Sequence, residues 1–338
     1  MTQDIQKFDL LILGSGICAQ SILFELSKSE RFDLDSLNIG QVSNDQLTAP
    51  CSLNSTSVVS LSGTSKGMSP LGDLIVDSYH YTVDQIKKDF EETFHPATQY
   101  FIYDENKCRA QFLRRNKEIV DQKIFDFDFQ GNREDCFILD NVSLMENISK
   151  KLNSLNLTKL QDTIVDVSKE RVVTLMSGER LFAKKIICGL GAYSNHFLKE
   201  MDHDHLNKSK VVPGDYLVFE DVDLESESIV ITMGHFNLVY RAYSKTILIG
   251  GTSLREEWNA VDYVELRPLY DFFKKIIPKL PPFESGHIKT GLRHKGRRRR
   301  PFLGEISDSI YSFHGVYKNG FTFSFCMANN FVNNDLIL

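Results

Sequence analysis

The stretch Phe8–Gly40, FDLLILGSGICAQSILFELSKSERFDLDSLNIG, contains the pattern on which the predicted fold depends. Its first residues, Phe8–Leu13, form an apolar run broken only by one aspartate, as expected for a buried parallel strand. A helix is predicted over Ile17–Lys28 from apolar residues at positions 19, 22, 23 and 26. A second strand is predicted over Leu37–Val42. The order strand, glycine turn, helix, strand indicates a βα unit of a parallel sheet.

The turn between the first strand and the helix reads G-x-G-x-x-A, at Gly14, Gly16 and Ala19. Gly14 permits a tight turn, and Gly16 leaves room for a pyrophosphate to approach the backbone. Ala19 allows the helix to pack closely on the strand. The helix N-terminus offers N–H groups and the positive end of its dipole to phosphates. The motif favours a dinucleotide site over an ordinary close-packed turn.

One part of the dinucleotide pattern is missing. An acidic residue is expected at the end of the second strand, roughly 20 residues beyond the glycines, where it holds the ribose hydroxyls. Here the strand end reads Ile39-Gly40-Gln41, while Asp33 and Asp35 precede the strand and are predicted to lie in a loop. Either Gln41 replaces the acid as a neutral partner, or the nucleotide binds more weakly.

Composition and charge narrow the class of protein. With 338 residues, 42% hydrophobic and 25% charged, the chain is expected to be a soluble globular protein of two interwoven domains. The net charge of −6 argues against a nucleic-acid-binding protein as a whole, though a local basic patch is compatible with it. No apolar run is long enough for a membrane span, and no signal peptide is expected before the first strand.

Neither the cysteines nor the histidines predict a metal site. The six cysteines form no C-x-x-C pair, so buried free thiols in a reducing cytoplasm are expected. The sequence Asp202-His203-Asp204-His205 contains metal-ligating residue types. A solvated loop is favoured there, because no other ligand set in the chain points to it.

The segment Ser52–Gly72 is rich in Ser, Thr and Gly and includes Ser55 and Thr56. A low-complexity linker is one interpretation. The alternative is an ordered loop beside a cofactor, where small side chains let a flat ring approach. The apolar pair Val58-Val59 and Leu61 favour the ordered loop, and Ser55 and Thr56 are counted among the candidate cofactor contacts.

The rest of the chain alternates strand and helix patterns. Helices are predicted over Thr82–Phe94, with Thr82 as its cap, Val142–Leu155 and Val261–Ile277. Strands are predicted over 97–103, 125–129, 163–167, 171–176, 180–182, 184–190, 210–220, 229–233, 238–243 and 246–250. A last strand, a glycine turn and a helix follow within Ser312–Phe331.

This order predicts an α/β fold in which a nucleotide-binding half is interrupted by a β-rich segment. The nucleotide-binding domain is assigned to residues 1–80, 140–209 and 286–338, and contains a parallel, Rossmann-like sheet. Residues 81–139 and 210–285 form a second domain with an antiparallel sheet, expected to bind the substrate.

In these segments the sequence resembles the D-amino acid oxidase superfamily of FAD-dependent oxidoreductases, and is closest in plan to the glycine oxidases. Five segments follow the family's order over nearly the whole chain: FDLLILGSGICAQSILFEL, KKIICGLGAYSN, VVPGDYLVF, LVYRAYSKTILIGGT, and the C-terminal pair GLR…PFLG and GVYKNGF. The resemblance implies a noncovalently bound FAD, a small amine or amino-acid substrate, and hydride transfer from that substrate to the flavin.

The resemblance also implies roles for individual residues. Gly14, Gly16 and Ala19 match the residues that face the FAD pyrophosphate, and Val165 matches a strand position whose backbone meets the adenine. Further matches to cofactor-binding positions lie in the last two turns: Gly191, Ala192, Gly315, Tyr317, Asn319, Gly320 and Phe321. Backbone amides of the last group would face the flavin and stabilise negative charge on its reduced form.

Arg293, in the sequence GLR, matches the arginine that binds the substrate carboxylate. A guanidinium group forms a bidentate pair with a carboxylate and fixes the substrate for reaction. Tyr240 and Arg241, on the predicted strands that floor the site, complete the candidate substrate-site set. The family usually has a proline where this chain has Tyr240.

The basic segment His294–Arg300, HKGRRRR, departs from the family, which has an acidic residue in this loop. It is interpreted as a solvated loop, as an entrance that draws an anionic substrate, or as a polyanion site such as some flavoproteins of this plan use for tRNA. A non-catalytic relative of the same fold is the main rival to an active oxidase. A dehydrogenase using NAD(P) alone is disfavoured, because the turns at Gly191 and Gly320 return to the nucleotide site.

Overall fold

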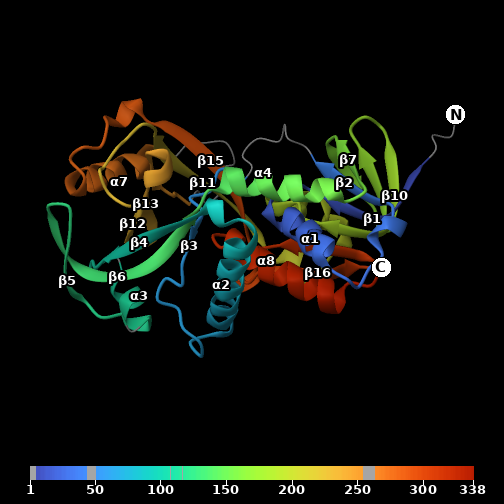
Figure 1. Cartoon of the computed structure of the whole chain (residues 1–338), viewed down its shortest axis with the longest axis horizontal. Coiled ribbons are helices and arrows are strands. Elements are labelled where there is room, and N and C mark those ends of the chain that lie inside the picture. Colours follow the sequence, from blue (N-terminus) through green and yellow to red (C-terminus); the bar gives the residue numbers. More distant parts are fainter. Residues whose placement is uncertain (1–4, 44–50, 107, 116, 254–262) are drawn as a thin grey trace.

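The computed structural model describes residues 5–43, 51–106, 108–115, 117–253 and 263–338. Two β-sheets lie at opposite ends of an elongated molecule, with helices packed around and between them (Figure 1). This arrangement confirms the predicted α/β fold with a Rossmann-like half. Within the described residues, no helix combines the length and the apolar character needed to cross a membrane.

The first sheet has eight strands in the described part of the chain, in the order β16-β17-β10-β1-β2-β7, with β9 beside β10 and β8 beside β9. The strands are β1 (Gln6–Leu13), β2 (Ile39–Ser43), β7 (Leu157–Gln161), β8 (Ile164–Val167), β9 (Val172–Leu175), β10 (Arg180–Cys188), β16 (Phe302–Ser307) and β17 (Ile310–His314). The strands β17, β10, β1, β2 and β7 pair in parallel. Their carboxyl ends therefore meet at one edge, where ligands of such sheets bind.

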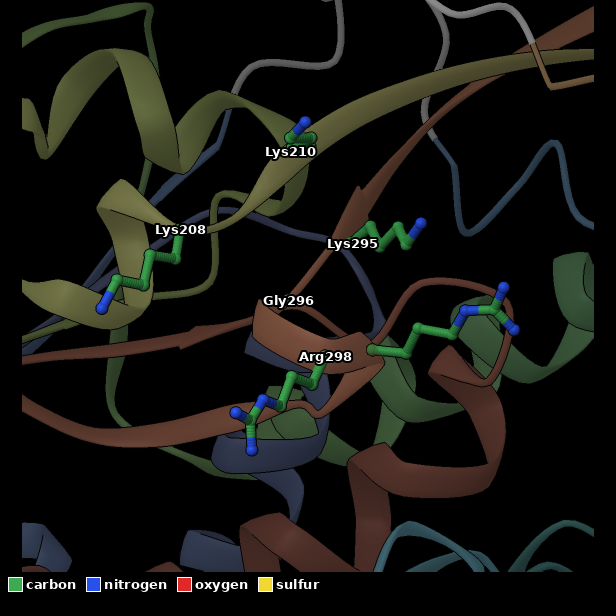
Figure 2. A pocket seen from close by; sticks show the side chains of 6 residues that line it. Lys208, Lys210, Lys295, Gly296 and Arg298 are labelled. Carbon is green, nitrogen blue, oxygen red and sulfur yellow. The ribbon is translucent and has the colours of Figure 1, made fainter.

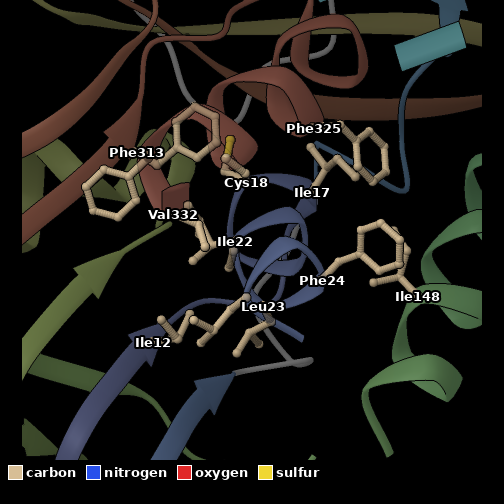
Figure 3. Close-up of a cluster of buried hydrophobic side chains, with 14 of the residues drawn as sticks. Ile12, Ile17, Cys18, Ile22, Leu23, Phe24, Ile148, Phe313, Phe325 and Val332 are labelled. Carbon is tan, nitrogen blue, oxygen red and sulfur yellow. The ribbon is translucent and has the colours of Figure 1, made fainter. Parts of the chain in front are cut away.

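Helix α1 (Ile17–Lys28) has the predicted bounds and lies at the centre of the first core. Its residues 17–26 are all buried, so the helix is enclosed on every side rather than on one face. Figure 3 shows Ile22, Leu23 and Phe24 of this helix among side chains from the other elements. The ring centroid of Phe24 lies 5.1 Å from that of Phe90 and 5.9 Å from that of Phe325. The other partners in this core come from α4 (Asn141–Lys151), α8 (Gly320–Asn330) and the strands beneath, while Phe90 directly follows α2 (Pro70–Asp89).

The second sheet runs in the order β15-β11-β14-β13-β12-β4-β6-β3, with β5 beside β6. Its strands are β3 (Val58–Val59), β4 (Phe94–Ile102), β5 (Val120–Ile124), β6 (Phe127–Leu139), β11 (Lys210–Phe219), β12 (Ile229–Met233), β13 (Phe236–Arg241), β14 (Thr246–Gly250) and β15 (His287–Lys295). All pairs are antiparallel except β4 with β12, which corrects the expectation of a purely antiparallel sheet. Helix α7 (Tyr263–Ile276) buries its apolar side chains against one face.

The sheet boundaries differ from the predicted domain boundaries at two strands. Both β3 and β15 fall in ranges assigned to the nucleotide-binding domain, but both belong to the second sheet. The long pairing of β15 with β11 explains the difference, because it joins nine residues of each strand. The second sheet therefore extends up to the basic segment. Strand β7 lies directly after α4 and was not predicted from the sequence.

Helix α2 (Pro70–Asp89) starts 12 residues before the start predicted at Thr82. The prediction that Thr82 caps this helix was therefore wrong. The cap is Ser69, whose side chain accepts a hydrogen bond from Gly72 N, and Pro70 occupies the first helical position. Thr82 lies inside the helix, is fully buried, and donates a hydrogen bond to the carbonyl of Thr322 at 2.9 Å. Pro70 and Gly72 in the first turn, and the Ser- and Gly-rich stretch before them, concealed the start of the helix.

The alternating sequence FDFDF, residues 125–129, was predicted as one strand but spans a turn. Phe125 has a positive φ of 52° and connects β5 to β6 in a hairpin. The remaining described helices are short: α3 (Arg109–Arg114), α5 (Ser194–Phe197) and α6 (Asp204–Asn207). The predicted strands 180–182 and 184–190 are one continuous strand, β10, and its hairpin with β9 is confirmed.

The C-terminal segment packs on the first core. Helix α8 continues into a π-helical turn, Phe331–Asp335, and Phe331, Val332 and Leu336 are buried. Arg31 also donates a hydrogen bond to the carbonyl of Val332. The polar asparagines of this tail are therefore the outer face of an ordered turn.

The two sheets are joined where β15 and β17 converge. Lys295 of β15 forms an isolated bridge with Val316, and the amide of Tyr317 donates to the carbonyl of His294 at 2.9 Å. His294 is 3% exposed and His314 is 1% exposed. Each ring is 2.8 Å from a serine hydroxyl, His294 from Ser209 and His314 from Ser312. Burial lowers the pKa of His294 to about 4 and that of His314 to about 3.

These two histidines predict a loss of stability in mild acid. They are neutral when folded but take up protons near pH 6.5 when unfolded, so the free energy of unfolding falls as pH decreases from about 6.5 toward 4. Each histidine contributes at most about 1.4 kcal/mol per pH unit. Denaturant unfolding between pH 7 and 5 measures the slope. The His314→Gln variant is expected to have a shallower slope, and an unchanged slope would contradict the assignment.

Candidate flavin and substrate site

The N-termini of α1 and α8 lie side by side at the carboxyl edge of the parallel strands. A Cβ placed on Gly320, the first residue of α8, would lie 3.6 Å from Cγ2 of Ile17, the first residue of α1. The N-cap residues of both helices make no side-chain cap bond, and neither helix has an acidic residue in its first turn. The two helix N-termini provide amide donors and positive dipole ends to the same place. The edge is therefore suited to bind an anionic group.

Close backbone packing explains why small residues occupy the first turn. Gly14 has a φ of +109°, and a Cβ on it would lie 2.6 Å from the carbonyl oxygen of Gly189. A Cβ on Gly189 would in turn lie 2.9 Å from Cβ of Ala19. The predicted close approach at Ala19 is thus made to the end of β10. Gly16 faces Ser52, whose hydroxyl accepts the amide hydrogen of Ile17 at 3.0 Å.

Gln41 is buried and bonded to the glycine turn, and its predicted contact with a ribose stays a prediction. Its side chain is 4% exposed, and its Nε2 donates a hydrogen bond to the carbonyl of Gly14 at 2.9 Å. Asp33 and Asp35 lie in an exposed turn before β2, as predicted. Gln41 therefore supports the glycine turn from behind, and strand β2 itself contains no acidic residue.

The three predicted cofactor turns follow neighbouring strands. Gly14 follows β1, Gly191 and Ala192 follow β10, and the segment 315–320 follows β17. Gly191 has a positive φ of 56°, and a Cβ on it would meet no atom within 4 Å among the described residues. Open space beside this turn and the two adjacent helix N-termini fit a dinucleotide with a pyrophosphate.

The other residues matched to the last turn have different surroundings. Gly315 packs against Gly296, since a Cβ on it would lie 2.9 Å from Gly296 Cα. Asn319 caps α8 without a side-chain hydrogen bond, and the Phe321 side chain is in the first core, which leaves its backbone for a ligand. Tyr317 has a φ of +48°. The expected flavin contacts of these residues stay predictions.

Val165 stands apart from these turns. It lies in β8, which pairs with β9, and its side chain is 49% exposed. No described contact joins it to the glycine turns, so its match to an adenine position stays a prediction.

The loop that contains Ser55 and Thr56 is ordered and tied to both halves of the protein. Asn54 donates to the carbonyl of Thr290 at 2.9 Å, and Arg241 donates from Nη2 to the carbonyl of Ser55 at 2.9 Å. Asn141 donates to the carbonyls of residues 52 and 53, both at 2.8 Å. These bonds favour the ordered interpretation over a linker. Arg241 therefore acts on this loop and lines a cavity of about 330 Å³ beside it.

Tyr240 does not join the site. Its side chain is 1% exposed and belongs to the core between the second sheet and α7. Its hydroxyl accepts a hydrogen bond from Leu224 N at 3.2 Å. Because neighbouring residues of a strand face opposite sides, Tyr240 points away from the face that carries Arg241.

Arg293 lies on β15, and backbone carbonyls hold its guanidinium group. Nε donates to Val212 at 3.3 Å, and Nη2 donates to Pro213 at 3.0 Å and to Thr252. These bonds use the hydrogen of Nε and both hydrogens of Nη2. In this conformation the expected bidentate fork is therefore not available, and within the described residues the two N–H groups of Nη1 are those left for a ligand.

Glycines make the surface around Arg293 flat. Gly214 lies opposite Gly291 in the pairing of β11 with β15, so both face the same side of the sheet as Arg293. A Cβ on Gly214 would lie 1.8 Å from Nη2 of Arg293. A Cβ on Gly251 would lie 3.9 Å from Nη1. The guanidinium group thus lies against the strands, and its remaining nitrogen faces the space beside Gly251.

Lys318 is a second cation at this place, and sequence reasoning missed it. Its ammonium group and the Arg293 guanidinium lie 5.9 and 5.6 Å from the ring centroid of Tyr317. Burial of its nitrogen among protein atoms, together with the charges of Arg293 and Arg299, lowers the pKa of Lys318 to about 8, although part of its side chain is exposed. The sequence did contain a signal for Lys318, because it lies between Tyr317 and Asn319, two residues already matched to the cofactor segment.

Two more titratable groups lie next to Lys318. Its Nζ donates to the carbonyl of His235 at 3.4 Å, and the His235 ring is 3.7 Å from a carboxylate oxygen of Glu265. Burial and the charges of Lys318 and Arg293 lower the pKa of His235, which Glu265 opposes. The cluster therefore combines two cations, an imidazole and a carboxylate at the edge of the glycine surface.

The basic segment is partly neutralised. Asp204 forms ion pairs with Lys208 and Arg297. The second aspartate of the sequence Asp202-His203-Asp204-His205 is therefore paired with neighbouring cations. His203 and His205 stack with ring centroids 5.7 Å apart. No cluster of metal-ligating residues occurs among the residues described.

The position of Gln41 predicts that an acid there is harmful. Gln41→Ala removes one buried hydrogen bond and is expected to lower the free energy of unfolding by about 1 kcal/mol. Gln41→Glu is expected to lower it further, because a carboxylate cannot donate to the Gly14 carbonyl. Titration of FAD into each apoprotein should show weaker binding for both. Tighter FAD binding by Gln41→Glu at unchanged stability would instead place this residue at the ribose.

The contact between Gly214 and Arg293 predicts a specific steric effect. Gly214→Ala forces the guanidinium group from its carbonyl partners and is expected to lower the free energy of unfolding by about 1–3 kcal/mol. Gly291→Ala is the matched control on the paired strand, since its Cβ would have contacts no shorter than 3.5 Å. Chemical denaturation of both variants measures the difference. Equal stability of the two variants would show that Arg293 is not fixed as described.

Comparisons with known proteins agree with this geometry. The family model described as FAD dependent oxidoreductase matches residues 9–332. No curated protein matches the sequence at a significant level. The structure of glycine oxidase from Bacillus cereus ATCC 14579 is similar, with a TM-score of 0.77 and 14% identity, over 98% of this chain and 96% of that chain.

Two other solved structures have a similar fold. L-proline dehydrogenase from P. horikoshii has a TM-score of 0.74 and 14% identity, over 99% of this chain and 95% of that chain. L-alpha-glycerophosphate oxidase from Mycoplasma pneumoniae, solved with FAD bound, has a TM-score of 0.75 and 12% identity, over 98% and 95%. The match of the family model over nearly the whole sequence shows that the chain belongs to the family of FAD-dependent oxidoreductases.

Proposed function

We propose that this flavoenzyme oxidises the C–N bond of a small amine or amino acid whose carboxylate is held by Arg293 and Lys318. The observation that carries the proposal is the placement of these two cations around Tyr317, at the join between the cofactor turns and the glycine surface of the second sheet. Arginine and lysine side chains are suited to bind carboxylates.

The residues around the N-termini of α1 and α8 fit the FAD of this family. Its pyrophosphate would be held by the turns at Gly14 and Gly16 and by the N-terminus of α1. Backbone amides of Gly320 and Phe321 at the start of α8 would stabilise negative charge on the isoalloxazine. When bound, FAD supplies an acceptor for the hydride that leaves the substrate carbon.

The protein's own groups would bind and orient the substrate. Nη1 of Arg293 is free to donate while the other guanidinium nitrogens are fixed by carbonyls, so the cation is preorganised and needs little ordering on binding. The ammonium group of Lys318 would provide the second contact. A carboxylate between them would raise the pKa of Lys318 again, because it stabilises the charged form.

The hydride leaves a neutral amine, so a proton must be lost from a substrate ammonium group before or during binding. His235 has a lowered pKa and lies beside Lys318 and Glu265. A neutral imidazole in this position is suited to accept that proton. The two cations that hold the carboxylate also disfavour an ammonium group nearby.

The similar structures support an amino acid as the substrate class, since their names describe a glycine oxidase and an L-proline dehydrogenase. The rival, a non-catalytic relative of the fold, does not explain why fixed cations are kept beside the cofactor turns. A larger tRNA-like substrate would rely on the basic segment, which lies next to this site.

Anaerobic flavin reduction tests the proposal. The FAD-loaded protein is mixed with a panel of L- and D-amino acids and small amines, and loss of the visible flavin absorption is followed. At least one member is expected to bleach the flavin. Arg293→Ala is expected to reduce kcat/KM by roughly 100-fold or more, because it removes a charge-assisted contact.

Two controls sharpen this experiment. Arg109→Ala removes an exposed arginine of α3 that pairs with Glu105, and should leave the rate unchanged. Lys318→Met should raise KM more than it lowers kcat. If the protein binds FAD but no member of the panel bleaches the flavin, the non-catalytic rival is favoured. If the protein binds no FAD, both the proposed oxidase and the flavin-binding rival are rejected.

A further inference from the structure

A cavity of about 410 Å³ is lined almost entirely by cationic side chains, and we refer to it as the basic pocket. Figure 2 shows these side chains around the end of β15 and the start of β11. The lining residues are Lys208, Lys210, Lys295, Gly296, Arg298 and Arg299. Among the residues that the structure describes, no acidic one lines it. A cavity with this lining has a strongly positive potential.

Most of this charge is uncompensated within the described part of the protein. Asp204 pairs with Lys208, and its other partner is Arg297, which lies outside the pocket lining. No ion pair is found there for Lys210, Lys295, Arg298 or Arg299. Among the described residues, Lys208 is therefore the one lining cation that an acidic side chain neutralises, and the other four keep their charge.

The sheet brings two of the lysines together. Lys210 and Lys295 are directly opposite in the antiparallel pairing of β11 with β15. Like charges in opposite positions destabilise a sheet. β11 begins and β15 ends at this pair. A neutral or acidic residue at either position would remove the repulsion. Both ammonium groups therefore add to the positive potential of the pocket.

The backbone of the pocket is also strained. Arg298 and Arg299 have positive φ values of 53° and 64°, which side chains other than glycine rarely adopt. Gly296 allows the segment to fold tightly, since a Cβ on it would lie 2.0 Å from the carbonyl oxygen of Arg300. Strain of this kind is typical of ligand-binding segments. It fixes two consecutive arginines at the pocket instead of leaving them on an extended loop.

The pocket borders the proposed substrate site. The Lys295 ammonium group lies 5.7 Å from the ring centroid of Tyr317, and the Arg293 guanidinium lies 5.6 Å from the same ring. Lys295 also faces the same side of the sheet as Arg293, two residues along β15. A ligand held by Arg293 therefore has the basic pocket as its neighbour.

We propose that the basic pocket binds the phosphate group of a small ligand, and that this group belongs to the substrate, which is then a phosphorylated amine or amino acid. This inference rests on the proposed function for the reacting part of the substrate. Phosphate fits better than a second carboxylate, because it offers three oxygens and up to two charges to lysine ammonium groups and arginine forks. A nucleic acid fits less well, because the net charge of −6 repels a polyanion beyond the pocket.

Calorimetry with inorganic pyrophosphate tests the site itself, without turnover. It is added to the FAD-loaded protein, so that the pyrophosphate site of the cofactor is filled. Binding is expected for the unchanged protein and should weaken at least about tenfold in the Arg298→Gln/Arg299→Gln variant and in Lys210→Gln. Arg109→Gln and Lys150→Gln, exposed cations elsewhere, serve as matched controls with unchanged binding. No binding, or equal weakening in the controls, would overturn the proposal.

A second arm identifies the source of the phosphate. Serine and O-phosphoserine, each as both enantiomers, are compared as reductants of the flavin and as competitors of pyrophosphate. A phosphorylated substrate is supported if O-phosphoserine competes with pyrophosphate and serine does not, and if this competition is lost in the Arg298→Gln/Arg299→Gln variant. This holds even if neither compound reduces the flavin. Pyrophosphate binding without such competition would overturn the assignment to the substrate and leave a separate phosphate ligand. Binding of oligouridylate is measured in the same variants. If the pocket variants weaken it no more than the controls do, RNA is excluded as the ligand of the basic pocket.

Discussion

The packing of α1 against the ends of β1 and β10 is the constraint on which the rest of the structure depends. The amide of Gly189 donates to the carbonyl of Leu13 at 2.8 Å, and there is no room for a side chain on Gly189 beside Ala19. The two strands and the helix can therefore approach each other only if the residues at positions 14, 19 and 189 are all small. This approach sets the first helix N-terminus directly at the carboxyl edge of the sheet. Because β17 pairs with β10, the last turn and the start of α8 are brought to the same edge. Residues from both ends of the chain thus form one anion-binding edge.

The second sheet contributes to this edge through β15, which is the link between the two halves. It pairs with β11 for its whole length, and its end then bonds to the segment after β17 through Lys295 and Val316. Arg293 is on this strand, two residues before the join. Its guanidinium group is fixed by carbonyls of the neighbouring chain segments, so the position of the charge is set by the sheet rather than by a flexible side chain. The proposed substrate contact is therefore as rigid as the junction of the two halves.

The sequence was sufficient for features that depend on local pattern. The bounds of α1, the return of the chain to the parallel sheet and the ordered glycine turns follow from periodicity and turn chemistry. Features that depend on distant partners were not predictable in this way. Gln41 was placed at a ribose because of its position in the strand, but its amide bonds back to Gly14. Tyr240 was grouped with Arg241 although the two face opposite sides of one strand, which its alternation could have shown. The carbonyl partners of Arg293 come from segments some 40 and 80 residues away, and no local pattern encodes them.

The hydroxyl of Ser52 occupies a position with consequences for the whole molecule. It accepts the amide hydrogen of Ile17, which is one of the donors that a helix N-terminus offers to a phosphate. One N–H group cannot fully serve both acceptors, so a phosphate bound there must share or displace the hydroxyl. The loop that carries Ser52 is held by Asn141 at the start of α4 and by Arg241 on the second sheet. The first turn of α1 is therefore connected through this one loop to α4 and to the second sheet.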